Sequence, residues 1–83
     1  MLLEELTVKI EDIHVPVKRR RTLKAKTVGE LAESILENGL EKQIGVRRDG
    51  ERFVLVSGLH RLEACKALGE EDIAAIIVGA RHY

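Results

Sequence analysis

An Asp-Gly dipeptide between two strand-like runs is the feature that most constrains how this chain can fold. Asp49-Gly50 separates residues 43–48 from residues 51–56, and Asp-Gly in this setting is one of the strongest short-range signals of a β-hairpin. Asp and Gly both tolerate the positive φ that the two central positions of such a turn can require. The buried face of the hairpin is drawn from apolar residues that alternate along its strands: Ile44 and Val46 on the first, and either Phe53 and Leu55 or Val54 and Val56 on the second.

A helix over residues 28–38 is predicted before this hairpin. Thr27 and Glu30 have the spacing of a capping box. In this motif the Thr27 side chain accepts a hydrogen bond from the Glu30 amide, and the Glu30 side chain reaches back to the Thr27 amide. Asn38-Gly39 supplies the left-handed residue that ends a helix. The apolar residues of this segment recur at helical spacing and would share one face: Val28, Leu31, Ala32, Ile35 and Leu36.

A second helix, over residues 59–68, follows a break at Ser57-Gly58. Leu62, Cys65 and Leu68 form its buried stripe, and Gly69 ends it. Strands are predicted at the two ends of the chain. Leu6, Val8 and Ile10 alternate with polar residues, whereas residues 73–78 are a continuous apolar run that suits a strand covered on both faces.

The order strand, helix, hairpin, helix, strand predicts one α+β (mixed α/β) domain over residues 1–83, because a chain of 83 residues holds a single domain. A single cysteine excludes a disulfide framework and a Cys-cluster zinc site, and fits a reducing, cytoplasmic setting. No membrane span and no signal peptide are expected. Phe53 and Tyr83 are the only aromatic residues, which excludes the base-stacking surfaces of common RNA-binding folds.

The charge of the chain is unevenly distributed although its formal net charge is zero. Residues 13–29, here called the basic segment, contain six basic residues and no acidic one, which leaves 8 basic and 14 acidic residues elsewhere. Pro16 and this cluster predict a loop. Such a segment attracts phosphate or nucleic acid, or it is a solvated loop without a specific partner. Its basic residues are Lys18, Arg19, Arg20, Arg21, Lys24 and Lys26.

The clearest candidate site is the start of the second helix. The first amides of a helix have no intrahelical partner and carry the positive end of its dipole. Gly58 allows close approach to the backbone, and Arg61 and His60 add donors for phosphate oxygens. These features predict an anion site. The alternative is that Ser57 is simply an N-cap, Gly58 a turn residue, and His60 and Arg61 solvated side chains.

Three segments together resemble the ParB/sulfiredoxin superfamily, and specifically the N-terminal domain of ParB-type partition proteins. The similarity extends from about residue 6 to residue 78. The segments are Leu31-Ala32-Glu33-Ser34-Ile35 with Asn38-Gly39-Leu40, Gln43-Ile44-Gly45-Val46-Arg47, which is similar to the family's Gln-Pro-Ile-x-Val strand, and Ser57-Gly58-Leu59-His60-Arg61, which is similar to its Gly-x-(His/Arg)-Arg helix start.

This resemblance implies a nucleotide-phosphate pocket. Partition proteins bind and hydrolyse CTP while clamping DNA, sulfiredoxins use ATP to repair an oxidised cysteine, and a related group phosphorylates free serine. The implied ligand is therefore CTP or ATP, with Mg²⁺ as its companion. The implied phosphate contacts are Ser57, Gly58, Leu59, His60, Arg61 and Gln43, with one arginine of the basic segment, for which Arg21 is preferred. Lys18, Arg19 and Arg20 are candidates for contacting DNA or phosphate.

The sequence departs from the family at two positions. Leu59 occupies the place of the catalytic cysteine of sulfiredoxins, and of a glutamate linked to hydrolysis in many partition proteins. Leucine has neither a nucleophile nor a base. Ile44 replaces the usual proline of the strand. Cys65 lies in the apolar stripe and is interpreted as a core residue.

Other charged residues give weaker signals. Glu63 is the carboxylate nearest the pocket and could hold Mg²⁺, but a surface glutamate on a helix is the simpler interpretation. Glu33 and Glu37 are assigned to solvent. His14 and His82 have no partners at ligand spacing, so no metal site is predicted.

The preferred hypothesis is a ParB-like domain that binds nucleotide phosphates and acts as a regulatory or DNA-associated module. One alternative is a small nucleotide-dependent phosphotransferase or nuclease-like hydrolase, against which Leu59 counts. Another is a protein-interaction module that has lost the ligand. Nonspecific DNA contact through the basic segment and a homodimer that forms with nucleotide are the expected associations.

Overall fold

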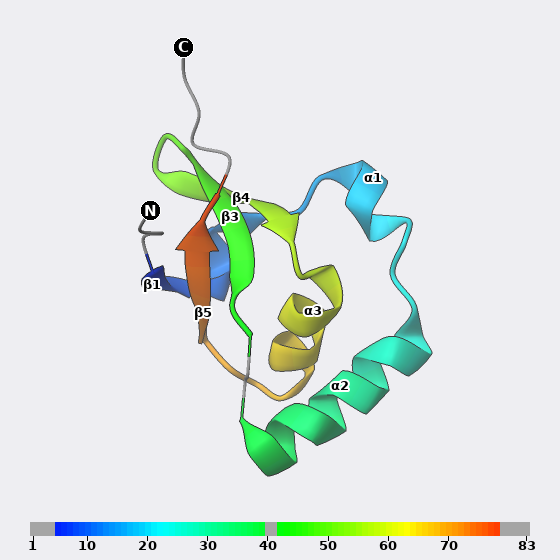
Figure 1. Cartoon of the computed structure of the whole chain (residues 1–83). Coiled ribbons are helices and arrows are strands. Elements are labelled where there is room, and N and C mark those ends of the chain that lie inside the picture. Colours follow the sequence, from blue (N-terminus) through cyan, green and yellow to red (C-terminus); the bar gives the residue numbers. More distant parts are fainter. Residues whose placement is uncertain (1–4, 40–41, 79–83) are drawn as a thin grey trace.

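A mixed sheet of five strands, in the order β1-β5-β3-β4-β2, organises the fold (Figure 1). The computed structural model describes residues 5–39 and 42–78, and the statements below concern these residues. Along the chain the elements are β1 (Glu5–Lys9), the 3-10 helix η1 (Ile10–Asp12), β2 (Ile13–His14), α1 (Val17–Arg20), α2 (Ala25–Asn38), β3 (Ile44–Asp49), β4 (Arg52–Ser57), α3 (Leu59–Ala67) and β5 (Asp72–Ile77). The predicted α+β class and order of the main elements are confirmed.

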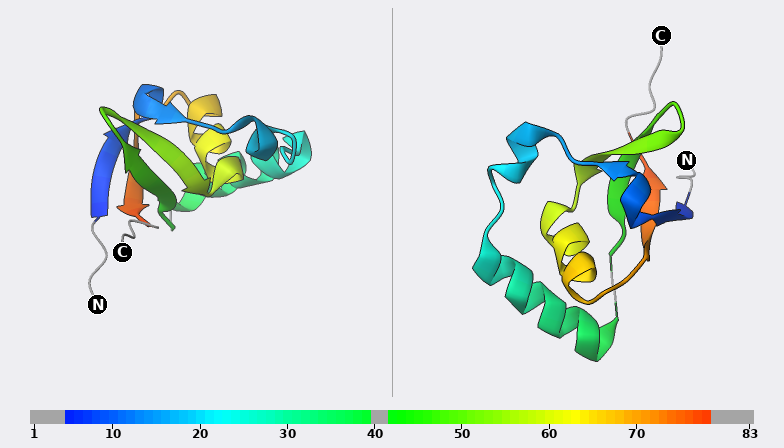
Figure 2. Two further views of the ribbon diagram at one scale, coloured as in Figure 1. Left: turned by 90° about the horizontal axis from the view of Figure 1, so that it is seen from above. Right: turned by 180° about the vertical axis from the view of Figure 1, so that it is seen from behind.

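The strands pair in both directions. β3 and β4 form the antiparallel hairpin, and β1 pairs with β5 in the same sense. β5 lies parallel to β3, and β2 lies parallel to β4. The larger helices lie to one side of the sheet, with α3 nearest to it and α2 packed on the outside of α3 (Figure 2).

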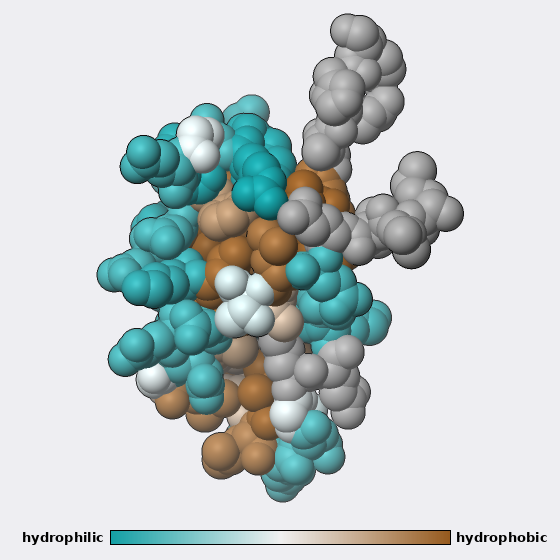
Figure 3. Space-filling view, turned by 90° about the vertical axis from the view of Figure 1, so that its left-hand side faces the viewer, coloured by the Kyte–Doolittle hydropathy of each residue, from teal (hydrophilic) through white to brown (hydrophobic). Residues whose placement is uncertain are grey.

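The core lies between the sheet and α3. Its most completely buried side chains are Ile44, Val46 and Leu55 from the hairpin and Leu62 from α3. The pairing of Val46 with Leu55 places the Phe53/Leu55 face of β4 toward the core, which decides between the two predicted faces. No residue of α2 is fully buried. Figure 3, which faces the left-hand side of Figure 1, shows hydrophobic surface between hydrophilic margins on that face of the molecule.

The hairpin forms where Asp49-Gly50 predicts it, but its turn is displaced by one residue. Asp49 pairs with Arg52, so the two turn residues are Gly50 and Glu51. Gly50 has a φ of 64°, and no described residue other than glycine has a positive φ. Asp49 is therefore the last residue of β3 and not a central residue of the turn, and of the two predicted turn residues Gly50 alone has a positive φ. A glycine at the first turn position followed by a residue of negative φ is the pattern of a type II′ turn.

The first helix begins earlier than the capping box predicts. α2 starts at Ala25 with Lys24 as its N-cap, and Thr27 lies within its first turn. The Val28 amide donates to the Lys24 carbonyl at 3.1 Å, which is the helical bond that a Thr27 N-cap would exclude. The predicted end is confirmed, since Gly39 has a φ of 81° directly after Asn38.

The basic segment is not the continuous loop that Pro16 and its charges predict. The amides of Arg19 and Arg20 donate to the Pro16 carbonyl at 3.0 and 3.2 Å and close the single turn of α1. Proline suits this position because a helix start needs no amide donor there. Ile10, predicted in the first strand, lies in η1 and packs against the core.

The last strand is covered on one face rather than on both. Ile73, Ala75 and Ile77 are buried, whereas Ala74 is exposed and Ile76 half-buried. β5 is an interior strand of the sheet, so its backbone is paired on both sides, but the helices lie on only one side of it. The continuous apolar run therefore reflects the position of β5 between two other strands of the sheet, and not burial of both of its faces.

Candidate functional site

The turn from β4 into α3 is built on Gly58. This residue is the N-cap of α3 and has a φ of 94°, a conformation that side chains rarely adopt. A Cβ at this position would lie 2.8 Å from Ile44 Cγ2 and 3.2 Å from Ile44 Cα. Gly58 therefore allows the helix start to lie directly against the beginning of β3, next to Gln43.

The first turn of α3 is the place at which the sequence predicts an anion site. No side chain caps it, and it contains no acidic residue. Ser57 is not its N-cap, because Ser57 ends β4 and pairs with Gly45, and a Cβ at Gly45 would lie 2.6 Å from Ser57 Oγ. The N-terminal amides and the positive dipole end of a nine-residue helix are thus left in the form that suits a phosphate group.

His60 and Arg61 follow in this first turn, and both are half-buried. The backbone amide of Lys24 donates to His60 Nε2 at 3.1 Å. Lys24 of the basic segment therefore lies against the candidate site, although 36 residues separate Lys24 from His60 in the sequence. Figure 1 shows the chain passing through α1 and around α3 before it enters α2.

The arginines of the basic segment are not joined to the first turn of α3 by any hydrogen bond within the described residues. Lys18, Arg19, Arg20 and Arg21 are exposed. Arg20 Nε donates to the Val15 carbonyl at 3.3 Å, within its own segment. The structure thus brings together Gly58, His60, Arg61 and the strand start after Gln43, and adds the backbone of Lys24, which the sequence did not indicate.

Residues 3–82 match the model of the ParB N-terminal domain. The chain belongs to this family. It is 40% identical over 62 residues to a probable chromosome-partitioning protein ParB from Campylobacter jejuni, an alignment that covers 75% of this chain and 22% of that protein. The chain spans between 22% and 27% of the length of the curated relatives it matches.

Solved structures share the fold of this ParB N-terminal domain. Sulfiredoxin from Arabidopsis thaliana superposes with a TM-score of 0.80 at 32% identity, covering 89% of this chain and 83% of that one. The C-terminally truncated partitioning protein ParB from Caulobacter crescentus, complexed with CTP-γ-S, superposes with a TM-score of 0.77 at 24% identity, covering 89% of this chain and 43% of that one.

Leu59, one of the two positions at which this ParB-type chain departs from the family, is part of the core. The Leu59 side chain is 7% exposed and belongs to the same apolar cluster as Leu62. It therefore stabilises the helix start through its packing in the core. Among carboxylates, Glu63 accepts from Lys66 Nζ at 3.3 Å, and Glu33 and Glu37 are exposed as expected.

The described residues contain neither a metal-binding cluster nor a helix that could span a membrane. No group of three or more His, Cys, Asp or Glu side chains within residues 5–39 and 42–78 is arranged to hold a metal ion. His82 lies outside these residues. None of the helices in the same part of the chain has the length and hydropathy that crossing a bilayer requires.

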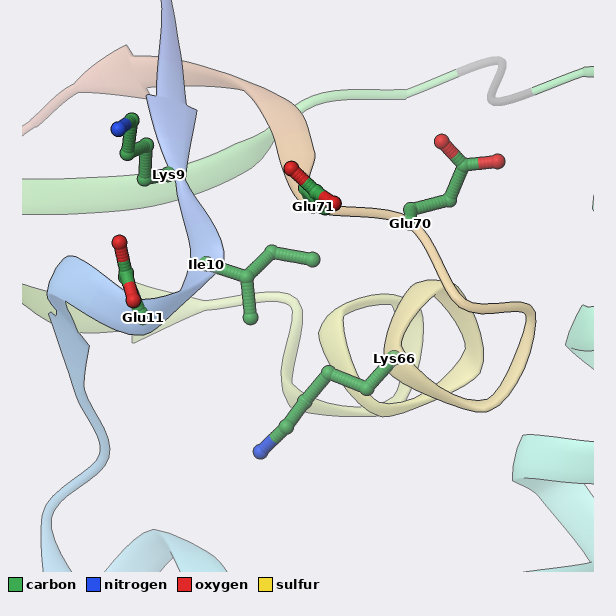
Figure 4. Close-up of a pocket in the computed structure, with 6 residues that line it drawn as sticks. All are labelled: Lys9, Ile10, Glu11, Lys66, Glu70 and Glu71. Atoms are coloured by element: carbon green, nitrogen blue, oxygen red, sulfur yellow. The ribbon is translucent and has the colours of Figure 1, made fainter.

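The pocket shown in Figure 4 lies away from the candidate site. It has a volume of about 380 Å³ and is bounded by the end of β1, η1, the last turn of α3 and the segment before β5. Charges of both signs surround Ile10 there. The lining residues are Lys9, Ile10, Glu11, Lys66, Glu70 and Glu71. It is thus at the C-terminal end of α3, opposite to the turn at Gly58.

Cys65 is a core residue, as predicted. Its side chain is buried, and burial raises the pKa of its thiol, with a smaller contribution in the same direction from the negative charge of Glu70. We expect this thiol to react with a disulfide reagent at least roughly 100-fold more slowly in the native protein than in urea, because reaction requires local opening that costs several kcal/mol. Labelling rates at pH 7 with and without urea measure this difference, and equal rates would contradict the core assignment.

The same pKa shift gives a stability effect with a defined sign. A thiol whose pKa is raised on folding is stabilised in its neutral form, so this contribution is complete below the pKa of the unfolded chain, about 8.5. It is lost as the pH rises through the higher pKa of the folded protein. Urea unfolding at pH 7 and pH 10 should therefore show a smaller alkaline loss for Cys65→Ala than for the unsubstituted chain.

Proposed function

We propose that this chain is a ParB-type module that binds a nucleoside triphosphate, CTP or ATP, through its phosphates at the start of α3. The observation that carries the proposal is the uncapped first turn behind Gly58, with His60 and Arg61 half-buried within it. The amides would bind one phosphate group, and the Arg61 guanidinium would pair with an adjacent one. Gly58 leaves room for that group to approach the backbone.

Two further facts support this proposal. The ParB relative from Caulobacter crescentus, which has the same fold, was crystallised with CTP-γ-S. The basic segment contacts His60 through the Lys24 amide, and its positive charges would attract a phosphate to this region. Mg²⁺ would arrive with the triphosphate, since the carboxylate nearest the turn, Glu63, is paired with Lys66.

Arg61→Ala is expected to weaken nucleotide binding by about 10- to 100-fold, the equivalent of one lost charge-assisted hydrogen bond. Isothermal titration with CTP, ATP, ADP and GTP, each with and without Mg²⁺, measures this change. Thermal shift at millimolar nucleotide gives a second reading.

Arg52→Ala is the matched control for this experiment. Arg52 is also a half-exposed arginine, but it pairs with Asp49 beside the turn of the hairpin. Its removal should leave nucleotide affinity within about twofold, since it lies outside the proposed site. Equal losses for the two variants would contradict the site, and no shift of the unsubstituted chain with any nucleotide would contradict the function and favour a protein-interaction module.

Phosphate release separates a binding module from an enzyme. Leu59 places a buried leucine at the family's catalytic position, so we expect nucleotide to be bound without measurable turnover by this chain. Release of phosphate, or its transfer to an added acceptor, would favour the phosphotransferase or hydrolase alternative.

Contact with DNA is the second part of the proposal. The exposed residues Lys18, Arg19 and Arg20 would contact the phosphate backbone without reading sequence. Binding to unrelated duplexes should therefore be equal and should weaken steeply as salt is raised. Light scattering with and without nucleotide tests the homodimer that the family resemblance implies.

A further inference from the structure

One hydrogen bond connects the basic segment to the candidate site. The Lys24 amide donates to His60 Nε2 at 3.1 Å, while the Lys24 carbonyl accepts from the Val28 amide at the same distance. Lys24 is the N-cap of α2, and no side chain caps that helix start. The N-cap of α2 is therefore held on one side by its own helix and on the other by α3.

The direction of this bond defines the state of the imidazole ring. A ring nitrogen that accepts a hydrogen bond carries no proton, and a neutral imidazole then carries its proton on the other nitrogen. An imidazolium has no acceptor at all. His60 is thus neutral with its proton on Nδ1 while it holds Lys24, and Nδ1–H is the donor that the ring still offers.

The other hydrogen bonds of this region, among the described residues, stay within the basic segment. Thr22 Oγ1 donates to the Arg19 carbonyl at 2.7 Å, and Arg20 Nε donates to the Val15 carbonyl. The bond to His60 is therefore the hydrogen bond that joins residues 17–24 to α3 in the part of the chain that the structure describes.

Apolar packing does not replace this bond. A space of about 420 Å³ opens between the start of α2 and α3. No residue of α2 is fully buried, and Leu23 is 41% exposed. The residues around that space are Leu23, Ala25, Val28, Glu63, Lys66 and Ala67. Because side chains leave this junction open, a single directional contact has a large influence on where α2 begins.

We propose that His60 is a positioning residue, which holds the N-terminus of α2, and with it the basic segment, beside the first turn of α3. In the proposed function, on which the ligand side of this inference rests, Arg61 and the helix amides contact phosphate, and His60 places the basic segment where its charges strengthen that site. A histidine that acted only as a phosphate donor would have no need of an unprotonated Nε2.

Two substitutions separate these roles. His60→Gln keeps an acceptor oxygen near the place of Nε2, whereas His60→Arg keeps a donor and a positive charge but has no acceptor. Hydrogen exchange of the Lys24 amide, measured by NMR on the whole chain without nucleotide, is the readout. His60→Arg should speed exchange by roughly 3- to 10-fold, the equivalent of one net hydrogen bond, and His60→Gln should change it by less than about twofold.

The amide of Val28 serves as the internal reference, because its acceptor is the Lys24 carbonyl and not the ring. Unchanged Lys24 exchange in His60→Arg would overturn the proposal, as would equal acceleration in both variants. A third measurement needs no substitution: ¹⁵N shifts of the imidazole should report a protonated Nδ1 and an unprotonated Nε2, and the opposite tautomer would overturn it.

All of these readouts are taken without ligand, so a failure of nucleotide binding leaves them standing. With CTP present, a positioning role predicts that His60→Arg loses more affinity than His60→Gln, despite its added positive charge. Retained affinity in His60→Arg together with altered Lys24 exchange would mean that the contact exists but does not support the site.

Discussion

Replacing Gly58 with alanine is expected to destabilise the protein by about 2–5 kcal/mol, a large part of the stability of a small domain. Two causes add at this residue. Its φ of 94° disfavours any side chain, and the new Cβ would lie 2.8 Å from Ile44 Cγ2 and 3.2 Å from Ile44 Cα. Ile44 is fully buried, and one of these contacts is to its backbone, so the clash cannot be relieved by turning a side chain outward.

Gly69→Ala is the matched control for Gly58→Ala. Gly69 also has a positive φ, 81°, and also flanks α3, but a Cβ there would have no atom within 4 Å. Its loss should therefore be limited to the backbone term, about 1–2 kcal/mol. Urea unfolding followed by circular dichroism gives both values. Equal losses would show that contact with Ile44 does not define the turn on which the candidate site is built.

The comparison of Gly58 with Gly69 also shows what a sequence can predict about this site. Both glycines were predicted to break or end elements, and both do. After α3, the Glu70 amide donates to the Cys65 carbonyl and the Gly69 amide donates to the Lys66 carbonyl, and together these bonds form a Schellman motif. What distinguishes Gly58 is its contact with Ile44, and a contact between separate strands has no local signature. The family resemblance indicated that these two segments meet, because it pairs Gln43 with the glycine turn.

Sequence patterns within one segment gave wrong element boundaries where contacts between distant segments determine the structure. The Thr27–Glu30 spacing satisfies the rule for a capping box, but α2 begins at Ala25 because the His60 ring provides a partner for the Lys24 amide. No pattern in either segment connects positions 24 and 60. Likewise the hairpin was correctly predicted, but its turn is displaced by one residue because Asp49 pairs with Arg52, with which it also forms an ion pair at 3.1 Å.

Replacing Leu62 with alanine is expected to cost about 2–5 kcal/mol, because it removes a large side chain from the centre of the core. Leu62 is 1% exposed and lies on α3 among the hairpin residues Ile44, Val46 and Leu55. In a domain of 83 residues the buried core is small, so few neighbouring side chains can move to fill the resulting cavity. The melting temperature should fall by roughly 4–8 °C for each kcal/mol lost.

Leu36→Ala is the matched control, since it makes the same substitution within a helix and leaves helix propensity out of the comparison. Leu36 is 76% exposed on α2, so its replacement should change stability by no more than about 0.5 kcal/mol. A loss as large as that of Leu62→Ala would mean that Leu36 is covered in solution. Because the chain alone leaves Leu36 exposed, such a loss should then depend on protein concentration, and no loss at any concentration would agree with a solvent-exposed Leu36.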